Sequence, residues 1–298
     1  MQESIVSSAP KPFAIWSDSR WATYLKERSP IGAMLFIGVS QTLASQGALG
    51  AHRNFTMLAL GTVGIAWTLT LMRLMDEKKD FAKDQIAHPD RPLPRGLLTL
   101  SEVHSMVSWN TFALLAGAAA LAFSGFGLAG TFLAATTLFS VLMYNEFWMP
   151  ELLNRRVFLN AIVHQPVVLL MYGFTNAIFK ETSFFSRESL GIAVAGIGAS
   201  FTFEICRKLD PTAPEILRTY LRITGKAKTL AAIFVSLAVL FVGGVLIHRP
   251  VFFGSLVAVQ IVLATWAIYY KPKRFKAAEA GSVLVSVGQM YAPWLSKI

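Results

Sequence analysis

Four of the 17 acidic residues of this 298-residue chain lie within nine consecutive positions, 76–84. Asp76, Asp80 and Asp84 repeat at every fourth position, so on a helix their carboxylates would share one stripe. Neighbouring carboxylates repel one another unless a cation lies between them, and oxygen ligands of this kind suit Mg²⁺. The spacing therefore predicts a Mg²⁺ site with coordination positions left for a phosphate. The alternative is a solvated loop in which three lysines of the same segment neutralise the carboxylates.

The elements that must position these carboxylates are long apolar segments. The chain is 54% hydrophobic and 15% charged, with a mean hydropathy of +0.52, which excludes a water-soluble globular domain. A hydrocarbon core of about 30 Å needs roughly 20 apolar helical residues. Strands of a membrane barrel alternate in polarity, whereas residues 230–247 are apolar throughout, so the spans are expected to be helices. Nine such spans are predicted, at 31–50, 54–75, 103–123, 126–145, 157–179, 189–206, 229–247, 251–270 and 277–295.

Positive charge is distributed unevenly between the two ends of the predicted helices. Of the 27 Lys and Arg residues, 21 lie at the amino terminus or in loops on the same side, and five lie on the opposite side. Cytoplasmic loops retain Lys and Arg, so the amino terminus is predicted to be cytoplasmic. The net charge of +10 comes in clusters between apolar runs, which indicates a lipid bilayer and no nucleic acid as partner. We expect one multi-pass domain over 1–298, in a bacterial inner membrane, with cytoplasmic segments 1–28, 76–102 and 207–228.

A proline-rich stretch, His88-Pro-Asp-Arg-Pro-Leu-Pro-Arg-Gly96, directly follows the acidic segment. Its three X-Pro bonds and its glycine force an extended, turning path, so the preceding helix must stop before it. A strip of aspartates at the end of a membrane helix, followed by such a turn, is a more specific pattern than the spacing of the aspartates alone.

Asp76-x-x-x-Asp80-x-x-x-Asp84 followed by Arg91-Pro-Leu-Pro-Arg-Gly96 resembles the first aspartate-rich motif of the UbiA superfamily of intramembrane prenyltransferases. In that family the motif begins Asn-Asp, so Asp76 takes the place of the Asn and Glu77 that of the next Asp. The resemblance implies an all-α integral membrane fold of nine helices around a central, lipid-open cavity at the cytoplasmic face. It also implies that the three aspartates hold Mg²⁺ on an isoprenoid diphosphate.

The same resemblance implies contacts to the diphosphate from outside the acidic segment. Arg28 is similar to an early arginine of the family, and Arg73 lies near the arginine that precedes the first motif. Tyr144 ends the fourth predicted helix, where the family has a tyrosine near the diphosphate. Arg91 and Lys208, with Arg73, would neutralise the remaining charge of the leaving group.

The second aspartate-rich motif departs from the family pattern. Glu204 matches the glutamate that opens it, and Thr219 with Gly225 reproduces its late spacing. Lys208, however, stands where the family has the first aspartate, and Asp210 lies one position away from the second.

Two hypotheses follow for this second segment. Either Glu204 and Asp210 contribute to a second metal site, or the Lys208 ammonium meets a phosphate oxygen directly, with Arg207 beside it at the helix end. The other basic residues of the segment are interpreted as charges that contact anionic lipid headgroups.

Three polar residues, Asn160, His164 and Gln165, lie inside the predicted helix at 157–179. Buried polar side chains are costly in a membrane and often line a cavity. His164 is either a general base toward an acceptor or the partner in a helix-to-helix hydrogen bond, and the hydrogen bond is the preferred interpretation.

Breaking an allylic carbon–oxygen bond develops charge of both signs, so a catalyst needs cations on the diphosphate and a dry pocket around the carbocation. The leading hypothesis is a Mg²⁺-dependent prenyltransferase that moves the prenyl group of an isoprenoid diphosphate to a lipophilic, aromatic acceptor. The first alternative is a terpene cyclase, in which the cation reacts with its own chain. The second is a non-catalytic lipid-binding or transport protein on a related scaffold.

Overall fold

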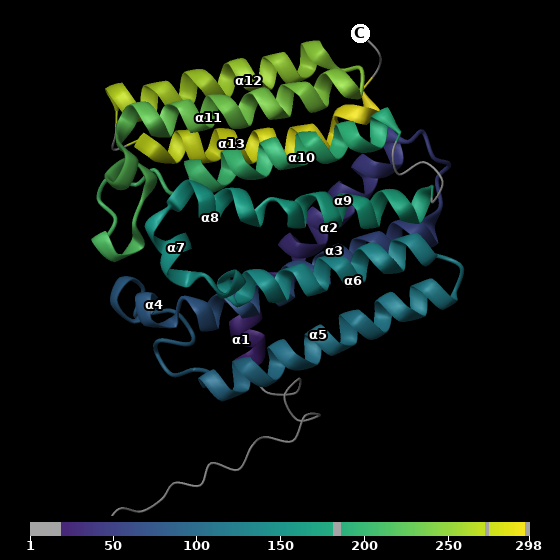
Figure 1. Ribbon diagram of the computed structural model, residues 1–298, viewed down its shortest axis with the longest axis horizontal. Helices are drawn as coiled ribbons and strands as arrows, with labels where there is room; N and C mark the ends of the chain where they lie inside the picture. The colour runs from purple at the N-terminus through teal and green to yellow at the C-terminus, as the bar shows by residue number, and fades with distance from the viewer. Residues whose placement is uncertain (1–18, 181–185, 272–273, 296–298) are drawn as a thin grey trace, which may run out of the picture.

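The computed structural model describes residues 19–180, 186–271 and 274–295, and its regular structure is helical throughout these ranges (Figure 1). The helices are α1 (Ser19–Arg28), α2 (Ile31–Ala48), α3 (Phe55–Lys79), α4 (Phe81–Ala87), α5 (Leu100–Phe123), α6 (Gly127–Tyr144), α7 (Pro150–Arg155), α8 (Val157–His164), α9 (Pro166–Phe179), α10 (Arg187–Cys206), α11 (Tyr220–Leu246), α12 (Pro250–Thr265) and α13 (Phe275–Tyr291). Each predicted span is helical, but the span at 157–179 is divided at Gln165 into α8 and α9. Pro166 begins α9 because it lacks the amide hydrogen that would continue α8.

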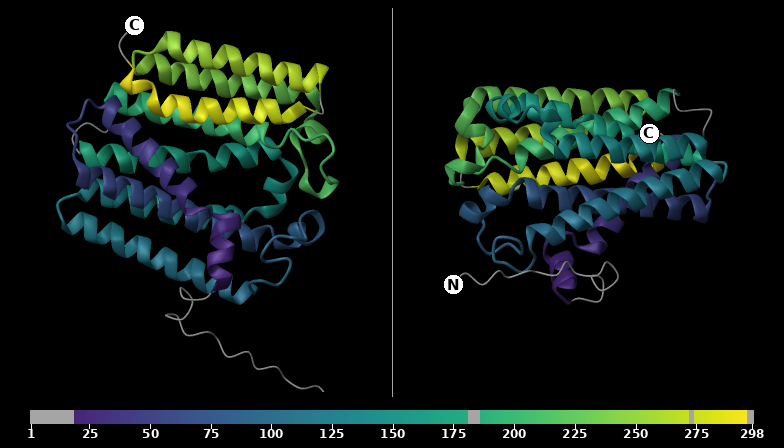
Figure 2. Two further views of the ribbon diagram at one scale, coloured as in Figure 1. Left: turned by 180° about the vertical axis from the view of Figure 1, so that it is seen from behind. Right: turned by 60° about the horizontal axis from the view of Figure 1, so that its bottom comes forward.

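Seven helical segments of the described chain have the length and hydropathy of membrane spans. They are α3, α5, α6, α8 with α9, α10, α11, and α12 with the turn to Tyr270. α2 is a continuous helix that contains polar residues such as Gln41 and Gln46, and α13 has only 17 residues. Both nevertheless pack in the same bundle, α2 against α3 and α9, and α13 against α10 and α12 (Figure 2). The expected helical membrane fold is confirmed, and the count of nine spans stays a prediction.

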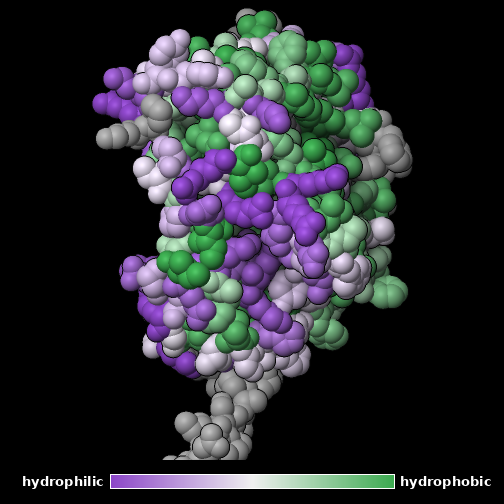
Figure 3. Space-filling model, turned by 60° about the vertical axis from the view of Figure 1, so that its left-hand side comes forward, coloured by the Kyte–Doolittle hydropathy of each residue, from purple (hydrophilic) through white to green (hydrophobic). Residues whose placement is uncertain are grey.

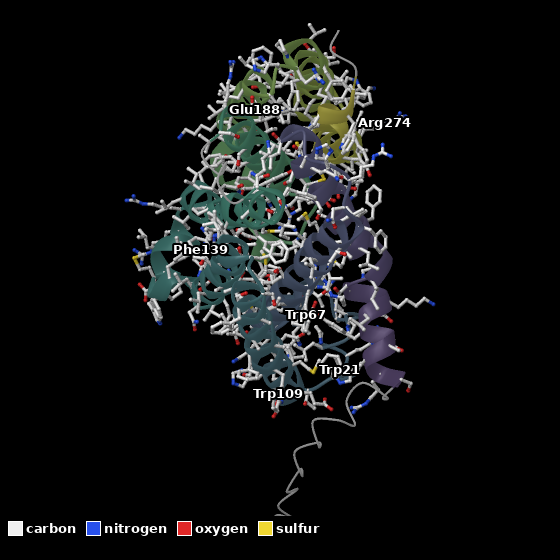
Figure 4. All side chains as sticks on the ribbon, turned by 90° about the vertical axis from the view of Figure 1, so that its right-hand side faces the viewer. Trp21, Trp67, Trp109, Phe139, Glu188 and Arg274 are labelled. Atoms are coloured by element: carbon white, nitrogen blue, oxygen red, sulfur yellow. The ribbon has the colours of Figure 1, made fainter. Side chains whose placement is uncertain are left out.

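Small residues and a polar bond hold neighbouring helices together. Gly198 faces the backbone of Leu240, and Gly243 faces Ala195, so a methyl group at either glycine would overlap the facing helix. This close approach of α10 and α11 replaces the hydrophobic driving force that is missing between helices in lipid. Elsewhere, the indole of Trp67 on α3 donates to Asn110 Oδ1 on α5 at 2.7 Å. Figure 4 shows where Trp67 lies in the bundle.

The connections that carry the predicted chemistry gather at one end of the bundle. Figure 1 shows α4, α7 and the segment between α10 and α11 at this end, and α4 contacts the short helix Glu215–Leu217 of that segment. Figure 3 shows a band of hydrophilic residues across this face, beside apolar surface. The fold therefore places the acidic segment at 76–84 and the basic segment at 207–228 on the same side, as the predicted topology requires.

Candidate active site

The acidic segment begins in the last turn of α3 and continues through α4. α3 ends at Lys79, and Asp80 interrupts the helix with φ −93° and ψ 1° before α4 starts at Phe81. Backbone hydrogen bonds from Asp80 N to Asp76 O and from Asp84 N to Asp80 O, both 2.8 Å, keep the segment close to helical across this break. The side chains of the segment nevertheless have very different surroundings.

Glu77 is buried, with 1% of its surface exposed, and it faces two arginines. Arg28 Nε donates to Glu77 Oε1 at 2.6 Å, and Arg73 Nη2 lies 3.3 Å from the same oxygen. A carboxylate removed from water keeps its charge only with such partners. The two arginines predicted as diphosphate contacts therefore meet at one buried glutamate.

Asp84 is buried in the same way, with 3% of its surface exposed. Arg91 Nη1 donates to both carboxylate oxygens of Asp84, at 2.6 and 2.7 Å. We refer to Arg28, Arg73, Glu77, Asp84 and Arg91 as the paired cluster, because each of its carboxylates is matched by a guanidinium.

Asp76 and Asp80 differ from the paired cluster in exposure and in partners. Their side chains are 54% and 42% exposed, and their cations are more distant, Arg73 at 3.9 Å from Asp76 and Lys83 at 3.7 Å from Asp80. In the described part of the chain neither carboxylate accepts a side-chain hydrogen bond. We refer to Asp76 and Asp80 as the open pair.

The second polar segment begins with Glu204 in the last turn of α10. Glu204 accepts hydrogen bonds from Arg207 Nε and forms an ion pair with Lys208 Nζ, each at 2.6 Å. This carboxylate raises the pKa of Arg207, whose guanidinium therefore keeps its charge. Asp76 lies close enough to interact electrostatically with both Glu204 and Arg207. The first and second motif segments thus influence each other electrostatically at Asp76.

The rest of the second segment forms turns. Asp210 Oδ1 accepts from the backbone N and the hydroxyl of Thr212, at 2.8 and 2.7 Å. Gly225 adopts φ 77° at a kink inside α11, a backbone conformation that a side chain would strain. Thr219, whose spacing to Gly225 matched the family pattern, has a buried hydroxyl without a partner.

A cavity of about 30 Å³ lies beside the open pair, between α3, α6 and α8. Tyr144, the last residue of α6, lines this cavity, and its buried hydroxyl has no hydrogen-bond partner. Lys78 Nζ lies 5.4 Å from the centre of the Tyr144 ring. The lining residues are Met72, Met75, Asp76, Lys79, Ser140, Met143, Tyr144 and His164.

His164 does not form the predicted bond to a neighbouring helix. Its Nδ1 lies 2.6 Å from the backbone oxygen of Asn160, one turn earlier in α8. That expectation was wrong, because the side chain bonds a backbone carbonyl of its own helix instead.

A larger polar cavity, about 290 Å³, adjoins the paired cluster and is lined by Glu27, Arg28 and residues 87–92. Arg95 spans its edge and donates to both oxygens of Glu27 at 2.9 Å. This hydrogen bond lowers the pKa of Glu27. Burial, together with the charge of Arg91, lowers the pKa of His88, so its imidazole is neutral near pH 7.

Among the described residues, no three carboxylate, imidazole or thiol groups converge as a ready-made metal site. The open pair by itself fits Mg²⁺, which proteins often bind through one or two carboxylates with substrate phosphates in other positions. The three other predicted metal ligands have partners within the protein. Asp84 pairs with Arg91, and Glu204 pairs with Arg207 and Lys208. Asp210 accepts hydrogen bonds from Thr212 in a turn.

Sequence reasoning missed Phe147 and the role of Glu77, although the resemblance had placed Glu77 at an aspartate of the family motif. Glu77 holds two arginines, and its signal was its position inside the acidic segment, one turn after Arg73. Phe147 packs its ring against His164 from the turn that follows α6. Its positive φ of 52° has no signal in the sequence, because no glycine or asparagine stands there.

Comparison with known proteins gives a structural likeness only. No family model matches the sequence, and no curated protein matches it significantly. The solved structure of a membrane digeranylgeranylglyceryl phosphate synthase is similar, with a TM-score of 0.61 and 13% sequence identity. The match covers 93% of this chain and 99% of the synthase. The chain therefore shares the fold of this synthase over nearly its whole length.

Proposed function

We propose that this protein is a Mg²⁺-dependent intramembrane prenyltransferase. It would ionise an isoprenoid diphosphate and transfer the prenyl group to a lipophilic, aromatic acceptor. The observation that carries the proposal is the open pair: two carboxylates without close partners, beside a cavity, at the polar end of a membrane bundle. The structural likeness to a digeranylgeranylglyceryl phosphate synthase in membranes supports the same reaction class.

Asp76 and Asp80 would hold Mg²⁺. The ion would supply positive charge opposite the diphosphate as the carbon–oxygen bond breaks. Arg207 and Lys208 both pair with Glu204 at the end of α10, and their charges would neutralise phosphate oxygens directly. Tyr144 would donate its unpartnered hydroxyl to the same group.

The paired cluster would approach the diphosphate from its other side. Arg28 bonds Glu77 through Nε alone, and Arg91 bonds Asp84 through Nη1 alone, so each guanidinium keeps further nitrogens for an anion. Glu77 and Asp84 would orient these two arginines through these hydrogen bonds. Asp84 would thus act through Arg91, and Arg73 would support Arg28 at Glu77.

The proposal includes the membrane topology predicted from the charges. α2 and α13 would span the bilayer with the seven longer segments, giving nine spans and a cytoplasmic amino terminus. The site would then open at the cytoplasmic face of a bacterial inner membrane. Here a charged diphosphate meets water while its isoprenoid tail enters the helix bundle.

The test is to incubate the detergent-purified protein and Mg²⁺ with geranyl, farnesyl and geranylgeranyl diphosphate, with and without a panel of phenolic lipids. Release of diphosphate and the organic products are measured, with Asp80→Ala as the inactive control. A prenylated phenol supports the proposal. A cyclic hydrocarbon formed without acceptor would make the protein a terpene cyclase. Tight binding without any diphosphate release would make it a non-catalytic lipid-binding or transport protein.

A further inference from the structure

The imidazole of His164 is held in one tautomer. Its Nδ1 lies 2.6 Å from the backbone oxygen of Asn160, and a carbonyl oxygen only accepts hydrogen bonds. Nδ1 therefore carries the proton, and the neutral ring keeps a lone pair on Nε2. In the described part of the structure Nε2 has no hydrogen-bond partner. The side chain is thus a base with its accepting atom unoccupied.

This unoccupied nitrogen belongs to a residue that lines the same cavity as Asp76 of the open pair. Asp76, Tyr144 and His164 come from α3, α6 and α8 and enclose the space of about 30 Å³. The Tyr144 hydroxyl is buried there without a partner, and buried polar groups are rarely left so unless a ligand or water satisfies them. The cavity therefore has room for a small polar group, about the size of one or two water molecules, between Asp76 and the imidazole.

The backbone beside His164 is strained in a way that fixes its ring. Glu146, Phe147 and Trp148 all have positive φ, between 49° and 55°, although none is glycine. Phe147 directs its edge at His164, with ring centres 5.7 Å apart, and also packs on Phe139 at 5.6 Å. Lys79, from the cavity wall, lies 3.7 Å from Glu146 and ties the turn to α3. Strained residues of this kind persist where the surrounding structure requires them, often at functional sites.

We propose that His164 is the catalytic base that takes the proton released when the prenyl cation is consumed. This inference rests on the proposed function. The allylic carbon–oxygen bond breaks and its electron pair leaves with the diphosphate. An acceptor then forms a bond to the cation with its own electron pair, and the proton that it sheds goes to Nε2. The resulting imidazolium returns the proton to water.

The proposal makes a prediction that needs no known acceptor. With a prenyl cation alone, a nearby base removes a proton from the carbon next to the cationic centre, and the electrons of that C–H bond form a new double bond. The product is then an alkene, whereas capture of the cation by water gives a prenyl alcohol. The ratio of alkene to alcohol therefore reports a base beside the cation.

The experiment uses the full chain in detergent with geranylgeranyl diphosphate and Mg²⁺, and compares wild type with His164→Gln and Gln165→Ala. Gln165 is the matched control, because it is the next residue and also bonds a backbone carbonyl one turn earlier. Diphosphate release and the alkene-to-alcohol ratio are measured in the same reaction. We expect His164→Gln to lower the ratio about tenfold or more while diphosphate release stays within about threefold of wild type. Gln165→Ala should leave the ratio unchanged.

An unchanged ratio in His164→Gln, or the absence of alkene from the wild-type reaction, would overturn the proposal while leaving the proposed function intact. Equal loss of diphosphate release and alkene in His164→Gln, at an unchanged ratio, would also overturn it and assign His164 a structural role. If wild type releases no diphosphate either with or without a phenolic lipid, the proposed function itself fails, and the base fails with it.

Discussion

The carboxylates of the paired cluster and of the open pair come from one short acidic segment, yet they differ in burial and in the distance to their cations. Glu77 and Asp84 are almost fully buried, and each is matched by guanidinium nitrogens at 2.6 to 3.3 Å. Asp76 and Asp80 are about half exposed, and their cations lie 3.7 to 3.9 Å away. The charges of Glu77 and Asp84 are neutralised by arginines of the protein itself. The charges of Asp76 and Asp80 remain available to a bound cation.

The carboxylates that support stability and those that support catalysis therefore lie within the same nine residues, 76–84. Removing one partner of a buried ion pair leaves an uncompensated charge and costs several kcal/mol. Removing an exposed carboxylate changes stability little, because water and distant cations supply most of its surroundings. The same chemical change, carboxylate to amide, is therefore expected to damage folding in the paired cluster and activity in the open pair.

The largest expected effect is on activity, in the open pair. Asp76→Asn removes one of the two proposed Mg²⁺ ligands, so diphosphate release from geranylgeranyl diphosphate should fall about 100-fold or more. The thermal unfolding midpoint in detergent should barely move, since the side chain is more than half exposed. Asp90→Asn, a change in the nearby proline-rich stretch, is the control and should keep wild-type release. Wild-type activity in Asp76→Asn would remove this residue from the site.

The next effect is on stability, in the paired cluster. Glu77→Gln leaves Arg28 and Arg73 facing a neutral amide in a buried place, and the free energy of unfolding should fall by about 3 kcal/mol. Denaturant unfolding of the purified protein, followed by tryptophan fluorescence, measures this loss. Asp76→Asn, in the same assay, should lose less than about 0.5 kcal/mol. Equal losses in the two variants would erase the distinction between the cluster and the pair.

The third prediction concerns the basic side of the site. Lys208→Asp restores the residue type found in the family motif, but here it would place a carboxylate beside Glu204. If Lys208 meets phosphate directly, the Michaelis constant for the isoprenoid diphosphate should rise about tenfold, because a charge-assisted contact becomes a repulsion. Arg222→Asp, in the same segment but bonded to the backbone of Ala213, is the comparison. Full activity in Lys208→Asp would favour a second metal at this position.

The smallest effect is expected at Glu27, an exposed ion pair that contrasts with the buried ones. Arg95 lowers the pKa of Glu27 below its ordinary value of 4.5. The pair therefore adds stability above about pH 4.5 and loses it as the pH falls through the lowered pKa. Glu27→Gln should lower the unfolding temperature slightly at pH 7 and not at all in strong acid. A difference that persists in strong acid would mean that the side chain acts through packing rather than charge.

The helices were predictable because membrane burial leaves a local signature in the sequence. Nine apolar runs predicted nine helical segments, and even the interruption at Pro166 had a signal, since proline cannot donate a backbone hydrogen bond. Most predicted ends differ by a few residues, but α11 begins nine residues earlier than predicted, at Tyr220 rather than at 229, because polar residues extend the helix beyond its apolar run.

The site was predictable only in part, because its partners are far apart in the sequence. The four-residue repeat grouped Asp84 with Asp76 and Asp80, but the break at Asp80 and the reach of Arg91 place Asp84 in the paired cluster. The bond from Arg28 to Glu77 joins residues 49 positions apart, and no local spacing indicates it. Local periodicity predicts which side chains share a helix face, and it says nothing about which distant cation reaches them.

The central claim, that the open pair rather than the paired cluster holds Mg²⁺, is tested most directly by a metal titration. Diphosphate release is measured against Mg²⁺ concentration for wild type, Asp80→Asn and Asp84→Asn, at a temperature where all three remain folded. We predict that the half-saturating Mg²⁺ concentration rises about tenfold or more in Asp80→Asn. It should stay within about twofold of wild type in Asp84→Asn, although that variant unfolds more easily. An equal rise in both variants, or a rise in Asp84→Asn alone, would contradict the account.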